Sequence, residues 1–431
     1  MQMKERFEEM FGRLSGNSGE IKRVTGNFLY LSILNAINIL LPLITLPYLM
    51  RTVGKANYGI YSYVYMILQY VIIFATYGFN FSATKQISQC RDDKEKVNEI
   101  YNAVIASKLI IGVILSALIL LLSGFILRDE QAPLMFVLGL GMVIGDILTP
   151  LWLFQGMEKM GYMTFVNASS KILFTVLVFI VIKKADDYYL LILLNSAGYL
   201  LAGIISLVLV SRQFGIHLRI VSFNEVRFQI KAGSAVFGST FGMYLYRNAN
   251  IIILKQFAPN EVVGIYSAAE KVIKGFQSIV SPAAQALFPH LSRRFKDKPD
   301  SENISLLKKV SVPFAAILAV LSGAVFVFAP LISDLLCGVE FRECIPLIRI
   351  MTLVIFFGEI NYLTGILGLI NMNRQKQFFY SVLITGVFSV LFMLVFAGRY
   401  GASAAAMSMS LSELLLTVLC LICLTGITRK R

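Results

Sequence analysis

MRTVGKANYGIYS at residues 50–62 and LKQFAPNEVVGIYS at residues 254–267 end in the same four residues, Gly-Ile-Tyr-Ser. In both places a long apolar stretch comes before a short connection with a basic residue, and a second apolar stretch begins at the shared glycine. The two copies lie about two hundred residues apart in a chain of 431. This matching position and context predict an internal repeat, in which Gly59 and Gly264 begin equivalent helices.

The composition is that of an integral membrane protein. Hydrophobic residues make up 57% of the chain and charged residues 15%, whereas soluble domains have roughly 45–50% and 25%. The apolar stretches are about 18 to 28 residues long, which suits a hydrocarbon layer about 30 Å thick. Residues 1–24 are charged throughout and contain no short apolar core with a cleavage site, so we expect no removable signal peptide.

Hydropathy predicts an all-α membrane protein with about twelve transmembrane helices. The predicted spans are 27–50, 58–80, 101–123, 133–155, 164–182, 188–210, 232–257, 262–290, 310–332, 345–372, 378–398 and 401–425. They divide into an N-terminal six-helix bundle at 1–210, a basic cytoplasmic linker at 211–231 and a C-terminal six-helix bundle at 232–431. Because each half has an even number of spans, the halves are expected to be parallel repeats related by a pseudo-twofold axis along the membrane normal.

Basic residues are distributed unevenly around these spans. Seventeen lie in the connections that follow even-numbered spans and eight in the opposite connections, and both ends of the chain are basic. Basic residues favour the cytoplasmic side, so we expect both termini in the cytoplasm. This topology, together with anionic lipid headgroups, explains much of the net charge of +14 and leaves little reason to expect nucleic acid binding.

Polar residues recur at helical spacing on four predicted spans, the first two of each half. Polar side chains within a membrane usually face protein or water, so complete stripes on equivalent spans favour a central cavity between the bundles. For any single residue, hydrogen bonding between helices is the alternative. The residues expected to line this cavity and to contact sugars are Asn35, Asn38, Tyr58, Tyr61, Tyr65, Gln69, Tyr244 and Asn248.

Three basic residues lie deep in the predicted spans of the second half. A rise of about 1.5 Å per residue places Arg247, Lys271 and Lys274 roughly 13–18 Å from the outer end, where a charge needs water, a counter-ion or a ligand. We favour an anionic ligand, and internal salt bridges are the alternative. Lys108 and Lys171 lie about two turns from the cytoplasmic end, so we expect their side chains to extend to the interface.

Four acidic residues also fall within or beside predicted spans, namely Asp146, Glu270, Glu359 and Glu413. Each is either a counter-ion for a buried base or a site at which H⁺ or Na⁺ couples to transport, and the sequence does not choose between these roles. The five cysteines and two histidines form no metal-binding pattern, so we expect neither a metal nor another cofactor. Cys337 and Cys344 flank an outer loop and either pair or remain buried thiols.

Several classes of protein are disfavoured by missing motifs. The chain has no phosphate-binding Gly-x-x-x-x-Gly-Lys-Ser/Thr loop and no cytosolic segment large enough to hydrolyse ATP. Its predicted outer loops are short and lack paired carboxylates or histidines, which argues against a membrane glycan polymerase or ligase. We therefore expect no enzymatic activity.

Two regions of the chain resemble the Wzx-type O-antigen and polysaccharide flippases. The first consists of NILLPLITLPYLMRTVGKANYGIYSY at 38–63 and YGFNFSATKQIS at 77–88, and the second of NIIILKQFAPNEVVGIYSAAEKV at 250–272 and ALFPHLS at 286–292. These flippases belong to the multidrug/oligosaccharidyl-lipid/polysaccharide exporter superfamily, and the resemblance extends through essentially the whole chain. It implies two six-helix bundles around a V-shaped cavity, working by alternating access.

The resemblance also implies a cargo and a location. The cargo is an oligosaccharide repeat unit on undecaprenyl pyrophosphate, moved from the cytoplasmic to the outer leaflet of a bacterial inner (plasma) membrane during O-antigen or other polysaccharide biosynthesis. Cationic cavity residues recur in the family, and Arg247, Lys271 and Lys274 are suitably placed here for the pyrophosphate. Expected partners are the lipid-linked oligosaccharide, membrane lipids, a coupling ion and other polysaccharide-assembly membrane proteins. The main alternative is an ion-coupled multidrug or organic-cation antiporter of the same superfamily, which would centre on carboxylates.

Overall fold

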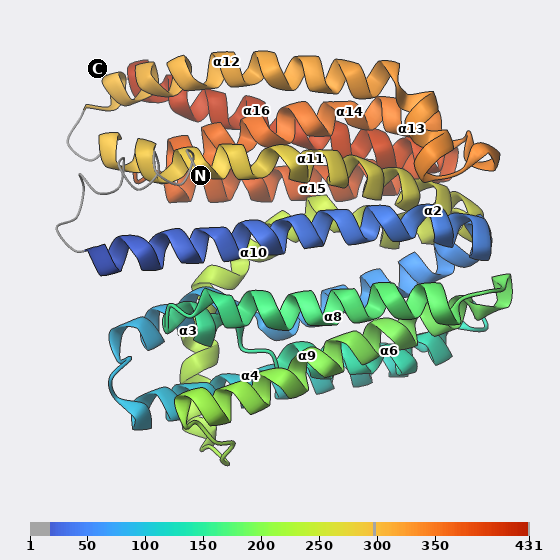
Figure 1. The fold of residues 1–431 in the computed structure, drawn as a ribbon. Helices are drawn as coiled ribbons and strands as arrows, with labels where there is room; N and C mark the ends of the chain where they lie inside the picture. Colours follow the sequence, from blue (N-terminus) through green and yellow to red (C-terminus); the bar gives the residue numbers. More distant parts are fainter. Residues whose placement is uncertain (1–17, 296–298, 430–431) are drawn as a thin grey trace.

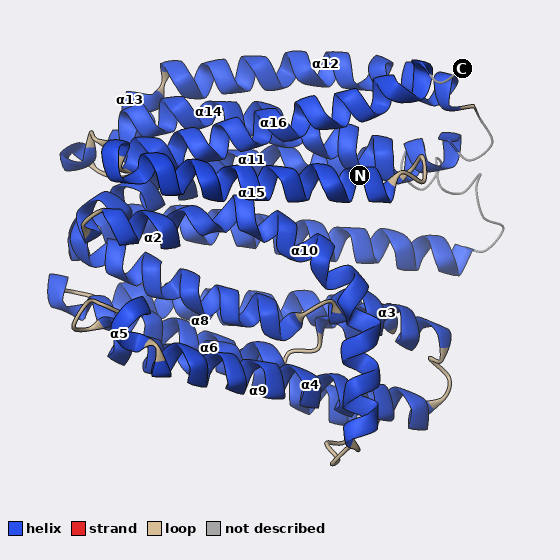
Figure 2. Ribbon diagram, turned by 180° about the vertical axis from the view of Figure 1, so that it is seen from behind, coloured by secondary structure: helices blue, strands red, loops and turns tan. Residues whose placement is uncertain are grey.

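The computed structural model describes residues 18–295 and 299–429, which form helices and connecting loops without a strand (Figure 1, Figure 2). The first half contains α2 (Ser18–Thr76), α3 (Phe79–Gln89), α4 (Lys94–Leu121), α5 (Ser123–Ile126), α6 (Ala132–Ile147), α7 (Leu151–Gly156), α8 (Met160–Val181), η1 (Ala185–Tyr189) and α9 (Leu190–Phe214). The second half contains α10 (Phe223–Phe257), α11 (Asn260–Phe295), α12 (Asp300–Val327), α13 (Ala329–Leu336), η2 (Val339–Phe341), α14 (Cys344–Asn361), η3 (Tyr362–Ile370), α15 (Gln375–Tyr400) and α16 (Ala402–Arg429).

The helices have the length and composition of membrane spans. Within the described part of the chain, nine segments are long and apolar enough to cross a membrane. One of these, Ala36–Gln89, contains most of α2 together with α3. α10 and α11 are not among the nine, although they are 35 and 36 residues long and carry the deep basic residues of the second half. The prediction of an all-α, multi-pass membrane protein is confirmed.

α2 is one element with a sharp break at Gly54. The backbone there has φ 76° and ψ 170°, a conformation that glycine adopts at low cost. The break divides α2 into a first leg before Gly54 and a second leg after it. The sequence predicts a loop at 51–57, but the chain is helical on both sides of this single residue. The second leg ends at Thr76, where Tyr77 and Gly78 separate it from α3.

The helices assemble into two lobes, which Figure 1 shows one above the other. In the N-terminal lobe, α9 packs against α6 and α8, and α2 packs against α4, α6 and α8. In the C-terminal lobe, α14 packs against α11, α12 and α16, while α15 packs against α10 and α16. The lobes meet where α2 packs along α11. This arrangement confirms the prediction of two helical bundles.

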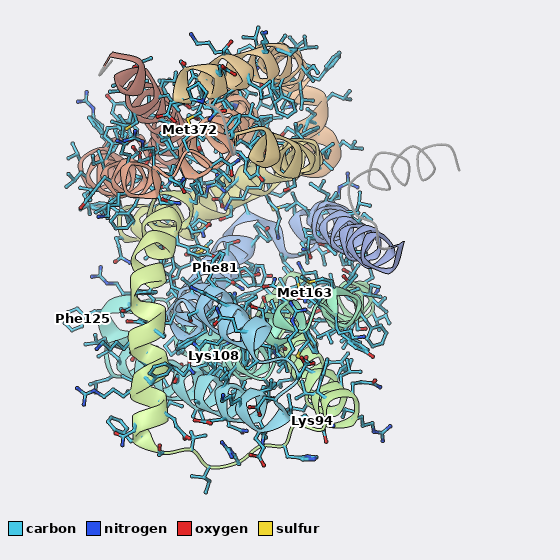
Figure 3. The ribbon with its side chains drawn as sticks, turned by 90° about the vertical axis from the view of Figure 1, so that its left-hand side faces the viewer. Phe81, Lys94, Lys108, Phe125, Met163 and Met372 are labelled. Carbon is cyan, nitrogen blue, oxygen red and sulfur yellow. The ribbon has the colours of Figure 1, made fainter. Side chains whose placement is uncertain are left out.

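α10 passes from one lobe to the other. Its first turns lie beside the N-terminal lobe and its later turns join the C-terminal lobe (Figure 3). The early part of α10 is held against α3 by hydrogen bonds between the side chains of Gln86 and Gln229 at 3.0 Å. Tyr77, which lies just before α3, stacks on Phe237 of α10 with ring centroids 4.4 Å apart. Of the predicted linker, only residues 215–222 lie outside helices, because α10 already begins at Phe223.

The two Gly-Ile-Tyr-Ser copies touch each other where α2 crosses α11. A Cβ atom on Gly59 would lie 1.8 Å from the carbonyl oxygen of Asn260, and one on Gly264 would lie 1.9 Å from the carbonyl oxygen of Lys55. Only glycine permits backbones to approach this closely. Each glycine thus contacts the residue four positions before the other glycine, which is the reciprocity that a local twofold axis produces. This reciprocal contact is what equivalent helices in two repeats would produce.

Ion pairs and a hydrogen bond join the lobes around the crossing of α2 and α11. Lys55 and Glu343 form an ion pair at 2.9 Å, and Lys255 and Asp129 form one at 3.0 Å. The Asp129 carboxylate also accepts a hydrogen bond from Asn260 at 3.0 Å. We refer to Gly59, Gly264, Lys55, Glu343, Asp129, Lys255 and Asn260 together as the interlobe contact.

Candidate functional site

Two cavities that share part of their wall lie along the second leg of α2, farther along this leg than the interlobe contact. The larger cavity is about 440 Å³, and its wall includes Gln69 from α2, Tyr244 and Asn248 from α10, and Lys274 from α11. It therefore lies between the lobes. The smaller cavity is about 220 Å³ and shares Tyr65 and Asp146 with the larger one.

The smaller cavity lies mainly within the N-terminal lobe, between both legs of α2 and helices α6, α8 and α9. Its polar wall includes Tyr61, Lys171, Asn195 and Tyr199. Among the lining residues, Lys271 alone comes from the second half of the described chain. A base on α11 thus extends across the lobe boundary into a polar space of the other lobe.

Three tyrosines form a ladder that leads to Lys271. The ring centroids of Tyr58 and Tyr61 are 5.8 Å apart, as are those of Tyr61 and Tyr65. The Lys271 ammonium donates to the Tyr58 hydroxyl at 3.1 Å and lies 5.6 Å from the centre of its ring. Tyr58 is only 1% exposed and lines neither cavity, so it orients Lys271 from behind, whereas Tyr61 and Tyr65 face the cavity space.

Amide side chains hold the phenol groups of this wall in place. Asn195 donates to the Tyr61 hydroxyl at 3.0 Å, and Gln69 donates to the Tyr199 hydroxyl at 3.2 Å. Both hydroxyls belong to residues of the smaller cavity. The wall therefore offers fixed hydrogen-bonding groups beside apolar ring faces, a combination that suits sugars as well as other polar ligands.

The three basic residues predicted to bind an anion differ in their surroundings. Lys274 pairs with Glu270 at 3.0 Å and donates to the Asn248 amide oxygen at 3.1 Å, on the wall of the larger cavity. Arg247 pairs with Glu413 at 3.4 Å and lines neither of the two cavities. For Lys271, no carboxylate of a described residue lies within salt-bridge distance.

Asp146 forms a buried ion pair with Lys108. The sequence predicts that Lys108 extends to the interface, but its side chain is 3% exposed and its ammonium lies 2.9 Å from the Asp146 carboxylate (Figure 3 labels it within the N-terminal lobe). The interface prediction for Lys108 is therefore wrong, because a carboxylate on α6 offers a closer partner. Thr76 also donates to Asp146, at 3.3 Å.

The other two acidic candidates lie inside the C-terminal lobe. Glu359 on α14 is 3% exposed and accepts a hydrogen bond from Ser281 at 2.6 Å. Glu413 on α16 is 1% exposed and accepts from Asn361 at 2.7 Å besides pairing with Arg247. Neither lines a cavity described above. Their role in ion coupling stays a prediction.

The two asparagines of the first leg are less informative. Asn38 is half-buried and lines neither cavity, and its side-chain oxygen has no hydrogen-bond partner among the described residues. Asn35 lies in α2, but its side chain falls outside the described part of the structure. Cys337 and Cys344, whose pairing was left open, are both buried free thiols.

Sequence reasoning missed several polar residues of the smaller cavity, including Asn167, Asn195 and Tyr199, and misplaced Lys171. Asn195 and Tyr199 lie four positions apart in the sixth predicted span, a helical spacing that placed both on one face. Lys171 was recognised as a charge within a span but was expected to reach the interface. In the structure Lys171 instead lines the smaller cavity. The signal in the sequence was a charged residue inside a predicted span. The error was to direct the Lys171 side chain to the membrane interface and not to a cavity.

The sequence comparison identifies the family. A model described as "Polysaccharide biosynthesis protein" matches residues 24–295. The chain belongs to this family. Two curated relatives are both named "Putative O-antigen transporter": the protein of Escherichia coli K12 is 30% identical over 92% of this chain and 95% of its own length, and that of Shigella dysenteriae is 24% identical over 91% and 98%.

Solved structures show the same fold in this family member. The lipid II flippase MurJ in an inward closed conformation has a TM-score of 0.75 at 12% identity, covering 92% of this chain and 87% of that one. A MATE multidrug transporter of the MOP superfamily aligns with a TM-score of 0.69 in its inward-facing conformation, at 11% identity over 90% and 98%. An outward-facing MATE structure aligns with 0.60, at 12% identity over 94% and 95%. At these identities the likeness concerns the fold.

Proposed function

We propose that this polysaccharide biosynthesis protein is a flippase for glycan repeat units linked to undecaprenyl pyrophosphate. It would move them from the cytoplasmic to the outer leaflet of a bacterial inner membrane, with both of its termini in the cytoplasm. Family membership and the names of the curated relatives support the substrate class. The lipid II flippase with the same fold supports a lipid-linked cargo.

One observation carries the proposal at the level of the site. Lys271 enters a polar cavity of the opposite lobe, and no described carboxylate neutralises it. A cation inside a membrane protein needs an anion or water, and a pyrophosphate supplies two linked phosphate groups to ammonium donors. Lys274 would add charge from the larger cavity, with Arg247 joining it if Glu413 releases the guanidinium.

The sugars would occupy the space beside the diphosphate. Tyr61, Tyr65 and Gln69 on α2 and Tyr244 and Asn248 on α10 present rings and amides around the two cavities. The polyprenyl tail would stay in lipid during the transfer. The lobes would then rock about the cavities in alternating access, opening the interlobe contact in one state and closing it in the other.

In this structure the interlobe contact is closed. Ion pairs and the glycine crossing join the lobes at that end. In the proposed topology the interlobe contact faces outward, so this state would load cargo from the cytoplasmic leaflet.

An ion-coupled exporter of organic cations is the second candidate, supported by the MATE fold. Such a protein would centre on a carboxylate facing the cavity. Asp146 has that position, but Lys108 already neutralises it at 2.9 Å. The charge of the cavity wall therefore favours an anionic cargo.

Substitutions in the native host separate the two candidates. We expect Lys271→Ala to accumulate lipid-linked repeat units on the cytoplasmic side and to reduce surface glycan, with normal protein in the membrane, and Lys274→Ala and Arg247→Ala to act in the same direction. The measurement is the leaflet distribution of the lipid-linked units, with protein level as the control. Wild-type surface glycan in all three variants would overturn the site. A defect confined to Asp146→Asn, Glu359→Gln or Glu413→Gln would favour the exporter.

A further inference from the structure

Lys171 lies on the face of α8 that forms one wall of the smaller cavity. Asn167, Ser170, Phe174 and Thr175 of the same helix line this cavity with it. Lys271 lines the cavity from α11, in the other lobe. Two lysines distant in sequence thus share a polar space of about 220 Å³ inside a membrane protein.

The charges around this cavity do not cancel. Asp146 is the acidic residue of the wall, and its carboxylate is already bound by Lys108 at 2.9 Å and by Thr76 at 3.3 Å. No carboxylate of a described residue lies within salt-bridge distance of Lys171 or Lys271. The space therefore carries two ammonium groups in excess. Like charges repel strongly where the effective dielectric constant is low, so this arrangement favours binding of an anion between them.

We propose that Lys171 and Lys271 form a two-lysine site that binds the diphosphate of the cargo between the lobes. This inference rests on the proposed function and adds α8 of the N-terminal lobe to the anion site. In the cargo the diphosphate is esterified at both ends, so each phosphate bears one ionised oxygen at neutral pH and the cavity supplies one ammonium group for each. Asn167 on α8 and Asn195 and Tyr199 on α9 line the same cavity and add uncharged polar groups to its wall.

The site has a consequence for the transport cycle. Because one lysine belongs to each lobe, the bound diphosphate would link the lobes across the cavity. Cargo binding would then stabilise the lobe arrangement in which the two ammonium groups are close, and release would follow when the lobes rotate apart. A site built only from α10 and α11 would not be coupled to lobe rotation in this way.

Binding measurements on purified protein test the site. The probe is radiolabelled undecaprenyl diphosphate, added to the protein in phosphatidylcholine nanodiscs. Losing one charge-assisted contact should weaken binding about tenfold or more, so we expect this loss in Lys171→Gln and also in Lys271→Gln. Lys171→Arg keeps the charge and should stay within about threefold of wild type. Lys159→Gln is the matched control, because Lys159 precedes the first turn of the same helix and is exposed.

The possible results separate the inference from the proposed function. Wild-type affinity in Lys171→Gln, together with a loss in Lys271→Gln, would overturn the two-lysine site and leave the flippase proposal standing. Equal competition by phosphatidylglycerol would overturn it too, because the site would then bind a lipid headgroup. Absence of diphosphate binding by the wild-type protein would contradict both proposals.

A second measurement needs no variant. Inorganic diphosphate should slow the reaction of Lys171 with an amine-directed reagent in the wild-type protein, while labelling of Lys159 stays unchanged. Peptide mass spectrometry reads both residues in one sample. Labelling of Lys171 at the same rate with and without diphosphate would overturn the site even if the glutamine variant fails to fold.

Discussion

Lys108 and Asp146 set the charge of the cavity wall at the level of single residues. Lys108 is almost fully buried, whereas the Asp146 side chain is 22% exposed toward the cavity. Removing one partner of a buried ion pair leaves a charge without compensation, which costs more than the pair itself contributes. While the pair is intact, Lys108 neutralises the Asp146 carboxylate, so this carboxylate does not attract a cation. Lys171 and Lys271 of the same cavity then remain available to an anion.

Lys108→Met should accordingly destabilise the protein. We expect a loss of about 3 kcal/mol, at the lower end for a broken buried pair because Asp146 keeps contact with the cavity. The double variant Lys108→Met with Asp146→Asn should recover most of this loss. Thermal unfolding in detergent measures both. A double variant no more stable than Lys108→Met would show that the pair is not what stabilises this wall.

The residue level is also where sequence reasoning was least complete. Depth within a span correctly marked Lys271 as a base that faces a polar space, since depth can be counted from one helix. It left open which acidic residue pairs with Arg247, because Glu413, the partner in the structure, lies 166 positions later in the chain. Nor did it show whether Lys171 and Lys108 point to the interface or inward, because the direction depends on neighbouring helices.

At the scale of elements, the crossing of α2 and α11 is the feature that the sequence predicted most directly. The repeated Gly-Ile-Tyr-Ser run indicated equivalent helices, and the structure adds that the two glycines touch. The spans themselves followed from apolar length. The continuous helix around Gly54 did not, because a single glycine with positive φ turns the chain where a loop of seven residues was expected.

Gly59→Ala should force the two helices apart. Its Cβ would lie 1.8 Å from a backbone carbonyl oxygen, which cannot move as a flexible side chain would. We expect a lower thermal midpoint, equivalent to about 3 kcal/mol. Gly323→Ala on α12 is the matched control, since nothing lies within 4 Å of the added atom. That change should be neutral or stabilise by up to about 1 kcal/mol. Equal midpoints for the two variants would contradict the close crossing.

At the scale of the whole molecule, the described part of the chain passes from one lobe to the other once, after α9 and through α10, and several polar contacts also join the lobes. The ion pair between Asp129 and Lys255 joins the loop before α6 to the last turn of α10. Alternating access requires such contacts to break and re-form in each cycle. The interlobe contact is therefore expected to be closed during loading and open during release.

Cross-linking this pair should stop transport without preventing binding. The variant carries Asp129→Cys and Lys255→Cys in a chain whose five native cysteines are replaced, and a short bis-maleimide joins the new thiols. We expect diphosphate binding to persist and translocation to fall to background, because the release state is blocked. Single-cysteine variants treated with the reagent control for modification alone. Full transport by cross-linked protein would show that this contact need not open.

Translocation by the purified protein is the most direct measurement of the proposed function. Wild-type protein and Lys271→Gln are reconstituted into vesicles that contain a fluorescent glycan on undecaprenyl diphosphate, and a membrane-impermeant reagent reports the glycans that reach the opposite leaflet. We predict rapid transfer by the wild type and transfer near the protein-free background for Lys271→Gln. Transfer by wild-type vesicles no faster than by protein-free vesicles would contradict the proposal that this chain flips lipid-linked glycans.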